Sequence, residues 1–424
     1  MIKTINLMII KVKEKITTLL RQSQKYTRTD NVYLFKYGSY LTLGDLVSLA
    51  SAFVLSLVFA RWLPKEVFGQ YQYLLAIFTI LAICSLEGMN NAIIQGVARG
   101  LEGAFGQGLR IRLKWGLLGS LAALGVGFYF WLQNNTTFAL ALLIIAFFLP
   151  FFKAGETFQS YLTGKKLFGQ RAAYTATIQV LASIAIVMAI FLTRNLLVLI
   201  LTYFAAYCLL RLIATFWLIK KMRPNRAVDP QVLNYGKHLS LMGVLNIIAG
   251  QIDKILLFFF LGPTQLAIYS FASLPIQYLR GPLQNIQELA WPQLATRSGE
   301  EIKKTLPKKL LKSCVLILLL IGAYVMAAPF FYKLFYPQYA DAIPYSQVLS
   351  FNLLVFPMSM MTLALAAKMK TKELYQSSII NPLAKIILFL IFVPLYGIWG
   401  VVIAILLNQV LYFFLATYLF KKIA

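Results

Sequence analysis

Residues 37–71 read YGSYLTLGDLVSLASAFVLSLVFARWLPKEVFGQY, and they align without a gap with residues 235–269, YGKHLSLMGVLNIIAGQIDKILLFFFLGPTQLAIY. Both stretches begin with Tyr-Gly, and Tyr71 of the first matches Tyr269 of the second at the same offset. Identity between them is low, but each stretch covers the first predicted membrane span of one half of the chain. The alignment therefore predicts two similar halves that enter the membrane in the same orientation.

The composition is that of an integral membrane protein. Hydrophobic residues make up 60% of the 424 residues, charged residues only 13%, and the mean hydropathy is +0.73. In soluble domains about a quarter of the residues are charged. Apolar runs of roughly 20 residues are long enough to cross the hydrocarbon core as helices. They predict an all-α protein with about twelve transmembrane helices, near residues 38–60, 70–98, 113–133, 138–163, 170–193, 197–219, 236–262, 264–294, 309–333, 342–367, 374–395 and 397–420.

The repeat and the spans divide the chain into four parts. Residues 1–36 form a basic tail whose apolar residues recur at helical spacing, as in a helix lying on an anionic membrane surface. Residues 37–222 form a first lobe of six helices, residues 223–234 a charged cytoplasmic linker, and residues 235–424 a second lobe of six helices. We expect the two lobes to be parallel and related by an axis along the membrane normal.

The distribution of basic residues predicts the orientation. The chain has 40 lysines and arginines against 14 acidic residues, a formal net charge of +26. Most of the basic residues fall in the tail, at the C-terminus and in alternate loops, one of which holds Arg110, Arg112 and Lys114. This alternation follows the positive-inside rule and places both termini in the cytoplasm. The charge therefore encodes orientation, and nucleic acid is not an expected partner.

Motifs for catalysis are missing from the sequence. His238 is the only histidine, which excludes HExxH zinc sites and other sites with several histidines. No segment has the spacing of a nucleotide-binding P-loop, and Cys84, Cys208 and Cys314 stand singly in apolar stretches. The sequence therefore offers no zinc, nucleotide or paired-cysteine site, and we expect no enzyme activity and no cofactor.

Three segments resemble a known family. FARWLPKEVFGQYQYLLAI at 59–77 and LEGMNNAIIQGVARG at 86–100 are similar to the opening of the polysaccharide flippases, the Wzx-type group of the multidrug, oligosaccharidyl-lipid and polysaccharide (MOP) exporter superfamily. GQIDKILLFFFLGPTQLAIYSFASLPIQYLRGPLQNIQELAWPQLA at 250–295 resembles the seventh and eighth helices of that family. The resemblance implies two lobes around a central cavity in the bacterial inner membrane. It also implies a flippase for a polyprenyl-diphosphate-linked oligosaccharide, such as an O-antigen or another surface-polysaccharide repeat unit, with polysaccharide polymerase and chain-length proteins as partners.

A cargo of this kind carries a diphosphate anion, and cations that face a wet cavity would offset the cost of desolvating it. Because charges inside a bilayer are costly, the basic residues within the predicted spans are the candidates for substrate binding. Five of them lie well inside a span, away from its ends: Lys153, Arg211, Lys254, Arg280 and Lys385. Arg280 shares one helical face with Gln277, Gln284 and Gln287, so Gln284 joins the expected substrate-binding residues. A polar contact between the lobes, without cargo, is the alternative role for Arg280.

Acidic residues in the spans are candidates for ion coupling, since a desolvated carboxylate can take up H⁺ or Na⁺. The spans contain Asp45, Glu87, Glu156, Asp253 and Glu288, and the first four are the candidates for ion coupling. Structural pairing with the five cations is an equal alternative. Glu156 stands three residues after Lys153, where the two side chains can pair on one helix.

Two other functions stay open. An ion-coupled exporter of a drug or small metabolite has the same fold, but a narrow, acidic cavity would suit it, whereas a lipid-linked glycan needs a wide, basic one. A membrane glycan polymerase or assembly scaffold would usually need a large external loop, and external connections such as QNNTT at 133–137 and PLYG at 394–397 are short.

The charge bias makes the topology testable with reporter fusions. Fusions at Arg223, Lys304 and Lys370 are expected to report the cytoplasm, because their segments are rich in lysine and arginine. Fusions at Asn135 and Tyr396 are expected to report the periplasm. A reversed result at any of the five sites would break the assignment of twelve spans and, with it, the parallel repeat.

Overall fold

The computed structural model describes the backbone of residues 31–423 and, apart from residue 230 and several between 285 and 296, the side chains from residue 44 onward. Residues 1–30 of the predicted tail lie outside the described residues. Every regular element in the described chain is helical, which confirms the all-α fold. The elements are α2 (Asn31–Trp62), α3 (Lys65–Leu81), η1 (Ala82–Ser85), α4 (Met89–Ala98), α5 (Gly103–Leu132), α6 (Thr136–Gly155), α7 (Thr157–Gly164), α8 (Phe168–Leu192), α9 (Leu196–Met222), α10 (Pro230–Ala249), α11 (Ile252–Thr296), α12 (Gly299–Phe335), η2 (Pro337–Ala342), α13 (Ile343–Leu349), η3 (Ser350–Leu354), α14 (Val355–Ala367) and α15 (Thr371–Phe420).

Ten helical segments among the described residues are long and apolar enough to cross a membrane. Two of them, Gln231–Gln284 and Thr371–Phe420, have 54 and 50 residues. One crossing needs roughly 20 residues, so each of these two segments has room to cross the membrane twice.

Both long segments double back at a glycine with positive φ, a conformation that glycine adopts without strain. In the first, φ is 81° at Gly262, and Tyr269 hydrogen-bonds Asp253 at 2.5 Å. Those two residues are 16 positions apart, which is about 24 Å in a straight helix. In the second, φ is 59° at Gly397. A Cβ placed on Gly400 would lie 2.0 Å from the carbonyl oxygen of Phe392, so the chain has turned there as well. Ten segments with two reversals agree with the twelve predicted crossings.

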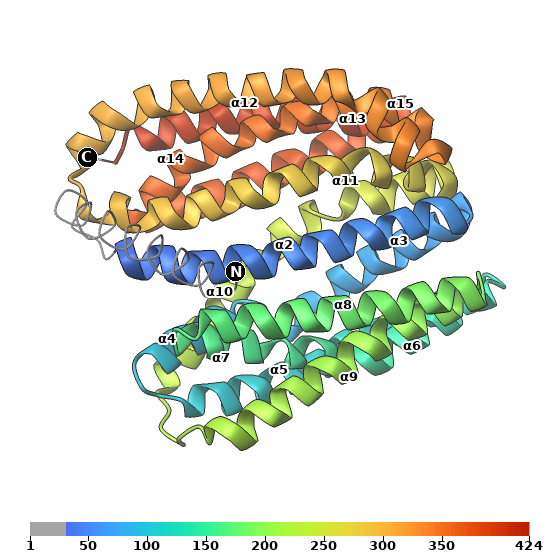
Figure 1. Ribbon diagram of the computed structural model, residues 1–424, viewed down its shortest axis with the longest axis horizontal. Coiled ribbons are helices and arrows are strands. Elements are labelled where there is room, and N and C mark those ends of the chain that lie inside the picture. The colour runs from blue at the N-terminus through green and yellow to red at the C-terminus, as the bar shows by residue number, and fades with distance from the viewer. Residues whose placement is uncertain (1–30, 424) are drawn as a thin grey trace, which may run out of the picture.

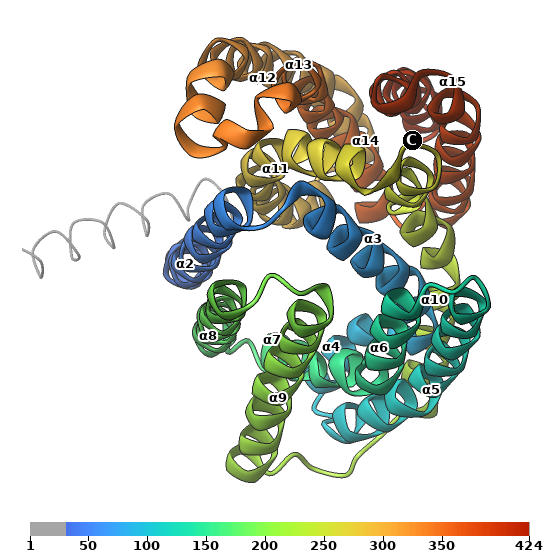
Figure 2. The ribbon, with the colours of Figure 1, turned by 90° about the vertical axis from the view of Figure 1, so that its right-hand side faces the viewer.

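The helices form two groups, shown in Figure 1. One group contains α4 to α9, the other contains α11 to α15, and α2 and α3 lie between them. α2 packs along α8 of the first group, whereas α3 packs along α11 of the second. α10 contacts both α4 and α15 and so connects the two groups. Figure 2 shows the same division from one end of the molecule.

Two predicted spans are interrupted inside the molecule. In the span 70–98, η1 follows α3, Leu86 takes a left-handed conformation with φ of 55°, and α4 begins only at Met89. The break leaves Glu87 between two helices. The span 236–262 is likewise divided between α10 and α11, directly before Asp253. Irregular backbone at membrane depth is tolerated only where protein buries it or where it lines a cavity. The two breaks therefore mark the places where polar groups can be held.

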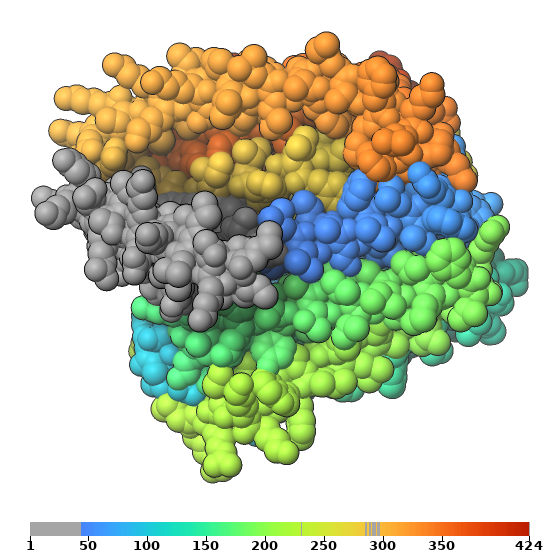
Figure 3. Space-filling model, in the orientation of Figure 1, coloured from blue at the N-terminus to red at the C-terminus, as the bar shows by residue number. Residues whose placement is uncertain are grey.

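α2 and α3 contact the second group at the end of the molecule where α2 ends. The Arg61 guanidinium donates to the carbonyl oxygen of Leu334 at 3.0 Å, and the Lys65 ammonium lies 3.5 Å from the Asp341 carboxylate. On the face of the molecule that Figure 3 shows, α2, in blue, lies between α12, in orange, and α8, in green. The charge bias predicts that this end faces away from the cytoplasm.

Candidate functional site

A cavity of about 540 Å³ lies within the second group of helices. Its walls come from the break between α10 and α11, from the middle of α11, from η3 and α14, and from both halves of α15. All of its described lining residues fall between Gly250 and Tyr412. One half of the chain thus builds this site, on side chains that two doubled-back segments bring together.

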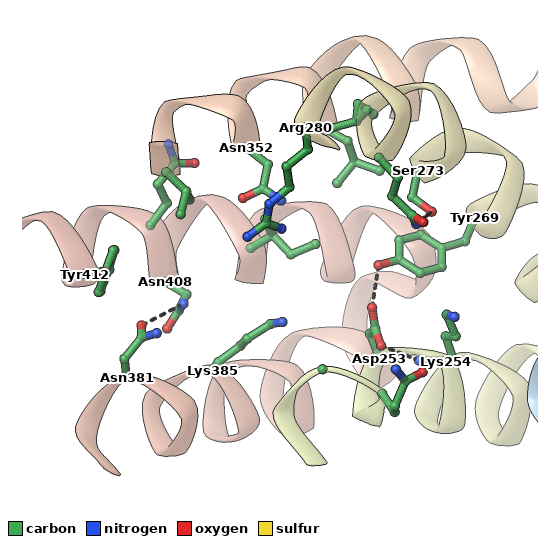
Figure 4. Close-up of a pocket in the computed structure, with 18 of the residues that line it drawn as sticks. Asp253, Lys254, Tyr269, Ser273, Arg280, Asn352, Asn381, Lys385, Asn408 and Tyr412 are labelled. Carbon is green, nitrogen blue, oxygen red and sulfur yellow. Dashed lines mark hydrogen bonds between the residues drawn. The ribbon is translucent and has the colours of Figure 1, made fainter. Parts of the chain in front are cut away.

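Three of the five cations predicted within spans line this cavity: Lys254, Arg280 and Lys385 (Figure 4). None of them takes part in the salt bridges formed by the described side chains. Asp253 is the one carboxylate among the described lining residues. Three positive groups therefore share the cavity with one negative group, and an anion that enters would be attracted.

Asp253 is held by hydrogen bonds on the wall of the cavity. Its side chain is buried, with 7% of the residue exposed. The Tyr269 hydroxyl donates to Oδ2 at 2.5 Å, and the backbone N–H of Lys254 donates to Oδ1 at 2.9 Å. Figure 4 shows the Asp253–Tyr269 pair on one side of the cavity. Each carboxylate oxygen of Asp253 thus has a hydrogen-bond donor of its own. The ammonium groups of Lys254 and Lys385 and the guanidinium group of Arg280 therefore stay available to a ligand.

Arg280 lies at the junction of two pockets. It lines the large cavity together with Gln277, and it also lines a smaller pocket of about 70 Å³ with Gln284 and Gln287. The Gln287 side chain contacts the Ser359 hydroxyl of α14. The glutamines and Arg280 therefore form one continuous polar face of α11, directed towards α14.

The other two predicted cations, Lys153 and Arg211, lie in the first group of helices and are paired. The Lys153 ammonium is 2.6 Å from Glu87 and 3.7 Å from Glu156. The Arg211 guanidinium is 2.7 Å from Glu156. These contacts connect α6, α9 and the break before α4. We call Glu87, Arg112, Lys153, Glu156 and Arg211, which all lie in the first group of helices or in its connecting segments, the charge network.

Arg112 corrects a sequence-based expectation, because it was assigned to a basic cytoplasmic loop. In the structure it lies within α5 and is fully buried. Its guanidinium donates to the Asn90 side chain at 2.5 Å and to the Ser85 carbonyl at 3.2 Å, and it lies 3.8 Å from Glu156. A signal for this burial exists in the sequence. Arg112 shares a helix face with small residues that are also buried, Gly108, Gly116 and Gly119.

Of the remaining polar residues, some line the cavity and others lie outside it. Asp45 lies on α2 and is exposed, apart from both the cavity and the charge network. The carboxamides of Asn352, Asn381 and Asn408 line the cavity, although the sequence analysis did not select them. Asn381 precedes Lys385 by one helical turn, a spacing that could have indicated it. Among the described residues, no group of three or more His, Cys, Asp or Glu side chains could hold a metal ion. The cavity thus presents three positive groups, one carboxylate and several carboxamides.

The fold is similar to those of several solved membrane transporters, some of which belong to the MOP superfamily. An inward-facing multidrug-resistance MATE transporter of that superfamily matches with a TM-score of 0.65 and 14% identity, over 90% of this chain and 95% of its own. The lipid II flippase MurJ, in an inward closed conformation, matches with a TM-score of 0.64 and 14% identity, over 90% and 89%. A MOP transporter from Pyrococcus furiosus, for which reversed polarity of the binding pocket suggests a different function, matches with a TM-score of 0.60 and 16% identity, over 92% and 96%.

The family follows from the sequence itself. A model of the family described as polysaccharide biosynthesis protein matches residues 34–291, which is more than half of the chain. The chain therefore belongs to the polysaccharide biosynthesis protein family. A search of curated proteins finds no match.

The charge network predicts a large loss of stability when Glu156 is neutralised. Glu156 contacts Lys153, Arg211 and Arg112, so Glu156→Gln leaves three cations close together with Glu87 as their one remaining carboxylate. Breaking a buried pair in this way costs about 3–5 kcal/mol. Thermal unfolding of the purified protein in detergent should show the loss.

A second variant and a control test whether the loss of stability comes from the unpaired cations. Adding Arg211→Leu to Glu156→Gln should recover part of the stability, because one of the stranded cations is removed. Glu301→Gln is the matched control: it breaks an exposed pair with Arg297 at 3.4 Å and should cost less than about 1 kcal/mol. Equal unfolding temperatures for Glu156→Gln and Glu301→Gln would contradict the account of the network.

Proposed function

We propose that the protein is a flippase for a polyprenyl-diphosphate-linked oligosaccharide, such as an O-antigen or another surface-polysaccharide repeat unit. In this proposal it acts in the bacterial inner membrane, with both termini in the cytoplasm. It performs no covalent chemistry and moves the cargo by alternating access. Membership of the polysaccharide biosynthesis protein family and a fold similar to that of a lipid II flippase support it.

The observation that carries the proposal is a set of three cations around one cavity, none of which forms a salt bridge with another described side chain. A diphosphate that leaves water for the interior of a membrane protein loses strong hydration, and nearby positive groups offset that loss. Arg280 can bind phosphate oxygens through two parallel hydrogen bonds, whereas Lys254 and Lys385 act as point charges. In the same proposal Gln284 extends the polar path from Arg280 along α11.

We propose that residues 37–222 and 235–424 are the two moving lobes, joined by the linker 223–234. In the first lobe, Lys153 and Arg211 pair with Glu87 and Glu156, so their role in the proposal is to hold that lobe together while it moves. The contacts of Arg61 and Lys65 with the second lobe would break when the cavity changes sides. Polysaccharide polymerase and chain-length proteins would act next to this step.

Coupling to H⁺ or Na⁺ belongs to the same proposal, with Asp45, Glu87, Glu156 and Asp253 as its candidates. Asp253 is the one of the four that lines the cavity with the cations. Neutralising its charge there would strengthen the net positive field that an anionic cargo meets. Loading an ion and loading the cargo would then be linked through one cavity.

A drug or small-metabolite exporter is the second candidate function, because similar folds include multidrug-resistance MATE transporters. Three cations against one carboxylate disfavour a cationic drug and favour an anionic cargo. A membrane glycan polymerase or assembly scaffold is the third candidate, and no feature of the described residues favours it over transport.

Lipid binding by purified variants tests the role of the cations. Arg280→Ala and Lys385→Ala should each weaken binding of a polyprenyl diphosphate by about ten- to a hundredfold, the loss expected for a hydrogen bond to a charged group. Arg280→Lys should retain part of the affinity, because it keeps the charge but not the bidentate geometry. Microscale thermophoresis in detergent can measure all of these affinities.

Lys333→Ala is the control, since Lys333 is exposed and does not line the cavity. It should bind like the wild type. Raising the salt concentration should weaken binding to the wild type more than to Arg280→Ala. If Arg280→Ala and Lys385→Ala both bind polyprenyl diphosphate as tightly as the wild type, the cavity does not receive the anion.

A further inference from the structure

A second pocket, of about 200 Å³, lies where α11 ends and α12 begins, and it shares no lining residue with the cavity. α12 has 37 residues and is about 55 Å long, whereas one crossing needs roughly 20 residues. Its last turn contacts Arg61, so its first turns extend beyond the hydrocarbon core at the opposite end of the molecule (Figure 1). The charge bias predicts that this end faces the cytoplasm. We call this pocket the α12 pocket.

The exposed side chains of α12 change in character near residue 311. Before it they are mostly charged and include Lys304, Lys308 and Lys309. From Leu311, which is 69% exposed, to Leu334 they are mainly apolar. Apolar side chains face the hydrocarbon, whereas lysines gather next to the headgroups on the cytoplasmic side. The change therefore places the membrane surface close to residue 311.

The α12 pocket extends across that surface and has two kinds of wall. Its polar lining residues are Arg297, at the end of α11, and Thr305, Lys309 and Ser313 of α12. The three on α12 follow at four-residue steps, so they share one helix face over about 12 Å. The apolar wall belongs largely to a hydrophobic cluster that joins α11, α12, α14 and the end of α15. It consists of Ala290, Leu294, Ile302, Leu306, Leu310 and Met360.

Both cations of the pocket can receive an anion. Lys309 is exposed and takes part in none of the salt bridges formed by the described side chains. Arg297 pairs with Glu301 at 3.4 Å, but both side chains are partly exposed, so the pair is weak. A guanidinium has five N–H donors, and this one contact leaves others free. The described lining residues include no carboxylate.

The two hydroxyl groups add an acceptor function. Thr305 donates to the backbone carbonyl of Glu301 at 2.8 Å, and Ser313 donates to that of Lys309 at 3.0 Å. Each hydroxyl oxygen can still accept a hydrogen bond. A phosphate at neutral pH is mainly an acceptor and does not satisfy these oxygens, whereas the hydroxyls of a glycerol headgroup do. The polar wall therefore suits a phosphodiester that carries hydroxyl groups.

The apolar wall requires a second kind of chemical group on the same ligand. A free phosphate would leave this wall uncovered, whereas the acyl chains of a phospholipid reach it from the hydrocarbon side. A zwitterionic lipid would bring its own cation close to Lys309 and Arg297. About 10–15 Å³ is enough to hold one water, so the 200 Å³ pocket has room for a phosphodiester and the first carbons of its chains. Basic pockets between membrane helices on the cytoplasmic side are typical sites for anionic lipid headgroups.

We propose that the α12 pocket binds an anionic phospholipid of the cytoplasmic leaflet, such as phosphatidylglycerol. Arg297 and Lys309 hold its phosphate, and the acyl chains lie against the apolar wall. The lipid thereby connects the end of α11 to the start of α12 and contacts Met360 of α14. Met360 directly follows Ser359, which lines the cavity, so the bound lipid supports a helix that also forms the cavity wall. This site does not depend on the identity of the cargo.

Binding of two phospholipids to the purified full-length protein tests this proposal. The probes are dioleoyl phosphatidylglycerol and dioleoyl phosphatidylcholine in a non-ionic detergent, and native mass spectrometry counts the bound lipids. The wild type should bind phosphatidylglycerol at least about fivefold more tightly than phosphatidylcholine. Lys309→Ala and Arg297→Ala should each weaken phosphatidylglycerol binding about fivefold, the contribution expected of one basic residue near an anionic lipid. Binding of phosphatidylcholine should stay unchanged.

Lys308→Ala and Lys312→Ala are the matched controls. They remove the same charge from the same exposed stretch of α12, but neither residue lines the pocket. Both variants should bind phosphatidylglycerol like the wild type. Thr305→Phe is a complementary variant that keeps both cations and fills the pocket, and it should weaken phosphatidylglycerol binding as well. Thermal unfolding identifies the variants that are folded.

The outcomes distinguish the pocket from a general attraction of anions to this end of α12. Equal losses in Lys309→Ala, Lys308→Ala and Lys312→Ala would overturn the pocket, and so would equal binding of the two lipids by the wild type. Wild-type binding by a folded Thr305→Phe variant would also contradict it. Displacement of phosphatidylglycerol by inorganic phosphate at constant ionic strength would show a site for free anions and overturn the assignment to a lipid. None of these measurements involves the cargo, so the proposed function is tested separately.

Discussion

A charged side chain inside a membrane is costly unless it meets an opposite charge or a wet cavity. The five cations within the predicted spans fall into two sets, one next to carboxylates and one around a cavity. Lys153 and Arg211 are paired with carboxylates in the first group of helices, whereas Lys254, Arg280 and Lys385 line a cavity and form no salt bridge with the described side chains. The first arrangement neutralises charge within the protein. The second leaves positive charge for a ligand to neutralise, and the proposed cargo follows from it.

The breaks in the helices serve both arrangements. The irregular segment before α4 brings Glu87 to Lys153, and the break between α10 and α11 puts Asp253 and Lys254 on the wall of the cavity. Because the charge network joins α5, α6, α9 and the start of α4, the first group of helices is connected internally by electrostatic contacts as well as by packing. The second group carries the cavity and its charged and carboxamide groups. Within the proposed function, the two groups thus have different tasks.

The sequence was sufficient to predict the all-helical membrane fold and its long apolar helices, because hydrophobic length is a local property. It could not predict which cations are paired. The partner of Lys153 at 2.6 Å is Glu87, far away in the sequence, while the neighbouring Glu156 lies 3.7 Å away and also contacts Arg211. Arg112 was misplaced because a count of basic residues near a span end ignores the small residues on its helix face. Asn352 and Asn408 gave no signal, since a carboxamide becomes notable only when the structure shows that it lines a cavity.

The most direct test of the central claim is a sidedness assay in liposomes that contain the purified wild-type protein and a fluorescent polyprenyl-diphosphate-linked oligosaccharide. A membrane-impermeant reagent added outside measures the fraction of cargo exposed on the outer leaflet. The account predicts that the protein makes the inner-leaflet cargo accessible faster than in protein-free liposomes. It also predicts that a double variant with Arg280→Ala and Lys385→Ala loses this effect. Wild-type rates equal to those of protein-free liposomes, or equal rates for a polyprenyl-linked sugar without phosphate, would contradict it.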